Sequence, residues 1–63
     1  MDYLPEEGKR LLAKWRKGTM TKDEAKKLIS ILMHLLNDVG LPLDVADIAD
    51  YFILLLKKNF RIE

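Results

Sequence analysis

The chain has 63 residues, which is enough for one small domain. Its composition, 49% hydrophobic and 33% charged, is typical of a folded soluble protein and not of a disordered one. It has no cysteine, so disulfides and thiolate metal sites are excluded. Its net charge is +1, and no stretch has the basic density of a nucleic-acid-binding arm.

The apolar pattern excludes a membrane span. The longest apolar run has six residues, whereas a bilayer needs about 20. No signal-peptide pattern opens the sequence, so we expect a cytoplasmic protein. A fold of this size without disulfides gains roughly 3–5 kcal/mol from its own core, and oligomerisation is a common remedy.

The first predicted helix covers residues 5–17. Pro5 suits the first helical position, and the two glutamates that follow it suit the positive end of the helix dipole. Gly18 is a plausible C-cap, while Gly8 inside the helix costs about 1 kcal/mol relative to alanine. The apolar stripe is narrow and consists of Leu4, Leu11, Leu12 and Trp15. We expect an accessory helix that packs on the outside or the end of the rest.

Two further helices are predicted within residues 21–60. Thr21 and Glu24 form a capping box, from which a helix runs to about Asp38, where Gly40 and Pro42 stop it. Asp44 is the predicted N-cap of a third helix that ends near residue 59. The connection is short, so the two helices should form an antiparallel αα-hairpin. The predicted fold class is therefore all-α: this hairpin with a short N-terminal helix.

The hairpin helices carry more apolar surface than one chain can cover. Residues 51–56 are all apolar and therefore surround their helix completely. A second copy of the chain is the simplest partner, and two hairpins packed face to face give a four-helix bundle. The predicted dimer interface contains Leu28, Leu32, Met33, Leu35, Leu36, Phe52, Ile53, Leu55 and Leu56. The expected orientation turns Val45, Ile48, Phe52 and Leu55 towards the other hairpin helix and leaves Ile53 near solvent in a lone chain.

Three patterns that resemble functional sites have simpler structural interpretations. His34 and Asp38 have the spacing of two metal ligands on a helix, but a metal site needs more ligands than these. Asp44, Asp47 and Asp50 do not match a calcium loop, and the first two suit the start of a helix. Residues 32–36 match an L-x-x-L-L docking motif whose leucines the core also needs. We therefore predict no catalytic residue, cofactor or metal.

The first helix is basic and is the candidate surface for another partner. Its candidate residues are Lys9, Arg10, Lys14, Trp15, Arg16 and Lys17. A basic amphipathic helix can contact phosphates or an anionic membrane, although a solvated face is the simpler interpretation. A helix-turn-helix between the last two helices is disfavoured, because three aspartates at the start of the would-be recognition helix repel the DNA backbone. The function expected is a non-enzymatic homodimeric adaptor or regulatory protein that binds an unknown protein. The alternative is a transcriptional regulator that binds nucleic acid through the first helix.

The hairpin also resembles one protein family. The capped helix from Thr21, the turn at residues 40–42, the helix from Asp44 and the leucine-rich inner faces are similar to the small dimeric helical-hairpin proteins of archaeal spindle-shaped viruses. Those proteins are proposed to act as adaptors in larger assemblies. The resemblance covers about residues 21–60 and implies a viral, dimeric adaptor located in the host cytoplasm. It implies no catalytic residues.

Overall fold

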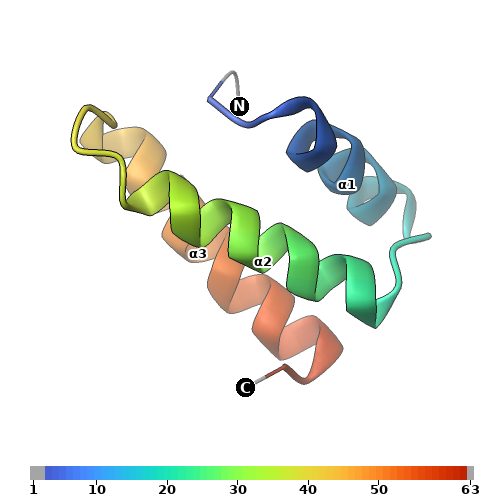
Figure 1. The fold of residues 1–63 in the computed structure, drawn as a ribbon. Coiled ribbons are helices and arrows are strands. Elements are labelled where there is room, and N and C mark those ends of the chain that lie inside the picture. Colours follow the sequence, from blue (N-terminus) through green and yellow to red (C-terminus); the bar gives the residue numbers. More distant parts are fainter. Residues whose placement is uncertain (1–2, 63) are drawn as a thin grey trace.

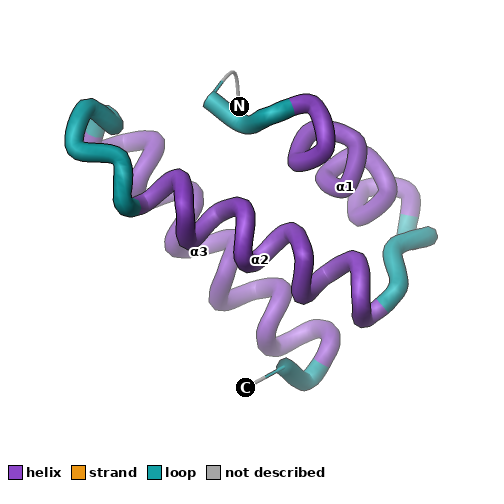
Figure 2. Tube along the Cα trace, viewed as in Figure 1, coloured by secondary structure: helices purple, strands orange, loops and turns teal. Residues whose placement is uncertain are grey.

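A computed structural model describes residues 3–62 of the chain, and within that range it contains helices and no strand. The helices are α1 (Glu6–Lys17), α2 (Lys22–Leu36) and α3 (Leu43–Phe60), drawn in Figure 1 and coloured by structure type in Figure 2. The predicted all-α class is confirmed. The bounds differ from the predicted ones by one or two residues at most ends.

The signals at the start of α2 and the end of α1 act as the sequence indicates. The Glu24 amide donates to the Thr21 hydroxyl oxygen at 3.3 Å, and the Thr21 amide donates to a Glu24 carboxylate oxygen at 3.1 Å. This is the predicted capping box. Gly18 ends α1 with a left-handed φ of 73°, and the next amide, of Thr19, donates to the carbonyl of Lys14 at 3.0 Å. A residue with a side chain would be strained at this position.

The connection between α2 and α3 differs from the prediction in detail. Helix α2 ends at Leu36, and Gly40 lies in the turn beyond it, where its amide donates to the Asp38 carboxylate at 3.1 Å. The prediction that Asp44 is the N-cap of α3 is wrong. The first helical hydrogen bond runs from the Ala46 amide to the carbonyl of Pro42, so the helix has already begun at Leu43. Asp44 lies in the first turn, where a carboxylate still interacts favourably with the helix dipole.

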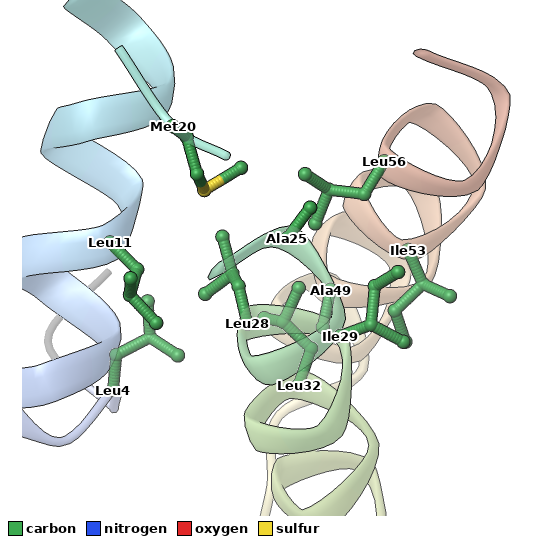
Figure 3. Packing of buried hydrophobic residues seen from close by; sticks show 10 residues of the cluster. All are labelled: Leu4, Leu11, Met20, Ala25, Leu28, Ile29, Leu32, Ala49, Ile53 and Leu56. Carbon is green, nitrogen blue, oxygen red and sulfur yellow. The ribbon is translucent and has the colours of Figure 1, made fainter. Parts of the chain in front are cut away.

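Helix α2 is the central element of the fold. It packs against α1 on one side and against α3 on the other, and α2 and α3 run in opposite directions (Figure 1). Leu28 and Leu32 of α2 and Leu56 of α3 are fully buried. Figure 3 shows the buried cluster, which consists of Leu4, Leu11, Met20, Ala25, Leu28, Ile29, Leu32, Ala49, Ile53 and Leu56. All three helices and the segment between α1 and α2 contribute to this single core.

Helix α1 is held on α2 by close packing and by charge. A Cβ atom at Gly8 would lie 3.2 Å from a methyl carbon of Ile31, so glycine permits the close approach of the two helices there. Lys14 binds Glu24 at 2.6 Å, and Lys27 forms an ion pair with Glu7. The helix-propensity cost of Gly8, about 1 kcal/mol, is therefore accompanied by a packing gain that the sequence pattern did not reveal.

The two ion pairs predict a pH dependence of stability. A hydrogen bond from Lys27 lowers the pKa of Glu7, and hydrogen bonds from Lys14 and the Thr21 amide lower the pKa of Glu24. A carboxylate whose pKa is lower in the folded state stabilises the fold above its ordinary pKa, and this contribution disappears as pH falls through the lowered value. We therefore expect the melting temperature to fall as the pH is lowered from about 5 to about 3.

The variant Glu7→Gln isolates one of these contributions. It should lower the melting temperature at neutral pH and weaken its dependence on acid, as thermal unfolding followed by circular dichroism would show. Glu6→Gln is the matched control, because Glu6 shares the first turn of α1 but has no ion-pair partner among residues 3–62. An acid response of the Glu7 variant equal to that of the wild type would contradict the expectation.

Candidate interaction surface

Helix α3 exposes more large apolar side chains than the other helices of the described chain. Leu54 and Tyr51 are 61% and 59% exposed, Ile48 is 43% exposed, and Leu43 at the start of the helix is also exposed. Single exposed apolar residues are normal on a protein surface, whereas a contiguous group indicates an interaction site. The arrangement of these residues around the helix therefore determines whether they form such a site.

One group is continuous with an aromatic contact between α1 and α3. The rings of Trp15 and Phe52 meet edge to face, with their centroids 5.6 Å apart. Ile48 and Leu55 lie four residues before and three residues after Phe52, so they share its stripe on α3, and the Tyr51 ring lies 6.5 Å from the Phe52 ring. On α1, Leu12 precedes Trp15 by three residues. We call this group the α1–α3 surface; it consists of Leu12, Trp15, Ile48, Tyr51, Phe52 and Leu55.

A second, smaller apolar group lies on the other side of α3. At 100° per residue, Leu54 lies about 160° around the helix from Phe52. It lies about 60° beyond Tyr51 on the exposed side of the helix, and about 100° from the buried Ile53. On α2, Met33 is 52% exposed and follows the buried Ile29 by one turn. We call Met33 and Leu54 the outer edge. It contains no aromatic residue and is the poorer candidate for a contact surface.

The predicted orientation of α3 is wrong. The residues buried against α2 are Ala49, Ile53 and Leu56, and Ile53 is only 7% exposed in the single chain. Val45, Phe52 and Leu55 are half-buried, and Ile48 is exposed. The physical reason is that apolar residues occur nearly all round α3, so its apolar pattern does not define a unique inner face. The fully buried Ala49 is small and lets α3 approach α2 closely.

The residues of the predicted dimer interface fall into two groups. Leu28, Leu32 and Leu56 are fully buried within one chain, as Ile53 nearly is, so they offer no surface to a second chain in this structure. The remainder are accessible: Met33 is exposed, and Leu35, Leu36, Phe52 and Leu55 are half-buried. Of these accessible residues, Phe52 and Leu55 belong to the α1–α3 surface.

The partner-binding candidates of α1 are not equivalent. Lys9, Arg10, Arg16 and Lys17 are exposed, whereas Lys14 binds Glu24 and Trp15 is half-buried against Phe52. On α3, Asp44, Asp47 and Asp50 are also exposed. Within residues 3–62 the ion pairs are Lys14–Glu24 and Lys27–Glu7, so the exposed bases of α1 and the aspartates of α3 have no ion-pair partner there.

The remaining candidate, His34 with Asp38, lies at an open depression. The two residues line a pocket of about 390 Å³ together with Pro5, Ile31 and Leu35. Both side chains are exposed. Across residues 3–62 no group of three or more potential metal ligands is close enough to hold an ion. Over the same residues, no helix combines the length and the apolar character that crossing a bilayer requires.

Comparisons with known proteins return no relative: no family model, no curated protein and no solved structure matches the chain.

Proposed function

We propose that the protein is a non-enzymatic homodimeric adaptor, which binds another protein in a larger assembly. The observation that carries this proposal is the α1–α3 surface, where Trp15, Phe52 and Tyr51 lie beside the exposed Ile48. Aromatic and aliphatic side chains grouped on a surface are typical of protein interfaces. Enzymes usually need an enclosed pocket with convergent polar groups, whereas the depression at His34 and a second one lined by Glu6, Glu7 and Arg10 are both open to solvent.

The dimer is the first part of the proposal. The core of one chain is small, and several apolar residues of α2 and α3 are exposed. Burying these residues against a second copy adds to the stability of the fold. The proposed assembly contains an antiparallel αα-hairpin of α2 and α3 in each subunit and a four-helix bundle at the contact. Because α1 lies on α2 and covers Leu28, the contact uses the residues that remain accessible around this core.

Sedimentation equilibrium at micromolar concentration tests the dimer. We expect a mass close to twice the 7.3 kDa of one chain. We also expect the melting temperature to rise with protein concentration, because dissociation is coupled to unfolding. A mass close to that of one chain over the whole concentration range would contradict the homodimer.

The adaptor role is the second part. The resemblance to the helical-hairpin adaptors of archaeal spindle-shaped viruses supports it and suggests a viral protein that acts in the host cytoplasm. Affinity purification from the native host should recover a defined protein partner together with the dimer. The variant Ile48→Asp, which changes the proposed surface, should lose the dimer and, with it, the partner that the dimer binds. Recovery of nucleic acid in place of a protein would contradict the adaptor role.

The alternative function is nucleic-acid binding through α1, which the exposed Lys9, Arg10, Arg16 and Lys17 favour. Against it, the exposed start of α3 is acidic and the net charge is only +1. We expect no sequence-specific binding of duplex DNA at about 0.15 M salt, as measured by mobility shift over a salt range. A sequence-dependent shift of nanomolar affinity at that salt concentration would favour the regulator over the adaptor.

A further inference from the structure

We infer that a second copy of the chain docks on the α1–α3 surface with twofold symmetry, so that the basic flank of α1 in each subunit faces the acidic start of α3 in the other. This inference rests on the proposed homodimer and specifies which face forms it. The four helices at the contact are then α1 and α3 of each copy, in place of the α2 and α3 of each copy that the sequence indicates. Three properties of the surface support it: its apolar centre, its charged flanks and their register.

The centre of the surface has the composition of an interface. Trp15 and Phe52 are half-buried in the middle of the surface, and Ile48 and Tyr51 are exposed next to them on α3. Tryptophan and tyrosine are enriched among residues that contribute most to binding. Helices α1 and α3 both pack on α2, and their backbones do not approach each other closely. On this side of the molecule the two helices therefore meet only through their side chains. The outer edge offers only Met33 and Leu54 for comparison.

The flanks of the surface carry opposite charges. On α1, Lys9, Leu12 and Arg16 follow one another at intervals of three and four residues, so two bases adjoin the apolar centre. On α3, Asp44 and Asp47 precede Ile48 and Tyr51 by four residues each, so two acids adjoin it there. All four charged side chains are exposed and have no ion-pair partner among residues 3–62. A second copy supplies the complementary charge for both flanks.

The register of the charges fits a twofold axis that runs along the helices. Helices α1 and α3 point in roughly the same direction (Figure 1), and the contact of Trp15 with Phe52 sets their relative level. Lys9 lies about 9 Å before Trp15, whereas Asp44 and Asp47 lie about 12 Å and 7.5 Å before Phe52, at 1.5 Å per residue. Rotation about this axis leaves the position of each residue along the helix direction unchanged. It places α1 of one copy opposite α3 of the other. Lys9 then lies between the two aspartates of the second copy.

The remaining charges on these helices are compatible with this arrangement. By the same register, Arg16 lies at the level of Tyr51 of the second copy, where a guanidinium can stack on the ring. Lys58, on the same side of α3, is about 21 Å from Asp44 along the helix and so does not neutralise the acidic start. Asp50 lies further round α3, towards the outer edge.

Charge reversal on each flank tests the inference. The variant Lys9→Glu with Arg16→Glu makes both flanks acidic, and Asp44→Lys with Asp47→Lys makes both flanks basic. Each double variant alone should dimerise at least about tenfold more weakly than the wild type, because like charges then face each other. Mixed in equal amounts, the two variants should form a heterodimer, because every flank again meets the opposite charge. Sedimentation velocity and native mass spectrometry, which separates the species by mass, would measure this.

Matched controls separate this face from the others. Lys22→Glu with Lys26→Glu reverses two exposed charges on α2 away from the surface and should leave the dimer intact. Ile48→Asp should dissociate the dimer, whereas Met33→Asp, at an exposed position of α2 away from the surface, should not. Circular dichroism establishes that each variant keeps its helices. If a charge variant fails to fold, the comparison of Ile48→Asp with Met33→Asp decides the question.

The outcomes distinguish the inference from the proposed function. A wild-type chain that is monomeric contradicts the homodimer itself. A wild-type dimer that survives both charge reversals and Ile48→Asp overturns the inference and leaves the homodimer in place. Dissociation by Met33→Asp alone places the contact at the outer edge. Failure of the mixed variants to pair, although each alone is monomeric and folded, also overturns the proposed arrangement.

Discussion

Replacing Ile53 with aspartate is expected to unfold the chain. Ile53 lies in the core cluster, 7% exposed, near Ile29 and Ala49 (Figure 3). The described core contains no buried polar side chain that a new carboxylate can bind. An unpaired carboxylate in such a site costs several kcal/mol, which is comparable to the roughly 3–5 kcal/mol that so small a core supplies. Far-ultraviolet circular dichroism at 25 °C should show the loss of most helical signal.

His34→Asp is the control for this variant. His34 is exposed on α2, so the same substituent there should leave the helical content and the melting temperature close to those of the wild type. An Ile53→Asp variant that melts at the wild-type temperature would contradict the buried position of the side chain. Because Ile53 is buried within one chain, its loss of fold reports on the core and not on a dimer contact. The exposed Ile48 is the suitable probe for the contact.

The local features of the fold follow from the sequence. The capping box of Thr21 and Glu24 and the left-handed Gly18 depend on chemistry within one helical turn, which a sequence displays directly. The narrow apolar stripe of the N-terminal segment also follows from the sequence, because its apolar residues are few and lie on one side. Leu4 and Leu11 of this stripe are buried. The confirmed all-α class rests on these signals.

The packing between helices did not follow from the sequence. Helix α3 is apolar nearly all round, so its inner face is set by which partner helix fits, and the small Ala49 permits that fit. A sequence displays Gly8 as a cost to the helix, whereas in the structure it allows α1 to approach Ile31. Lys14 and Glu24, which join α1 to α2, are ten residues apart, a spacing that no helical pattern identifies.

The location of the candidate site depends on which face of α3 is buried. With α3 turned as the sequence suggested, Ile48 belongs to the core and Ile53 is available for a partner. In the structure the two residues exchange these roles, and the exposed apolar surface moves to the side of α3 next to Trp15. Exposed apolar residues on α3 support the proposed dimer, while the location of the contact depends on the rotation of this one helix.

Truncating Leu28 is expected to have the second large effect. Leu28 is fully buried on α2, and it lies between Leu4 and Leu11 of the N-terminal segment and the residues of α3 (Figure 3). Leu28→Ala removes buried methyl groups and leaves a cavity, at a cost of about 2–5 kcal/mol. Since that range reaches the whole stability expected of this core, the midpoint of urea unfolding should fall steeply or the transition should vanish. Met33→Ala is the control, because Met33 is on the same helix and 52% exposed, and it should shift the midpoint little. Equal midpoints for the two variants would contradict the packing of α1 over Leu28, on which the α1–α3 surface depends.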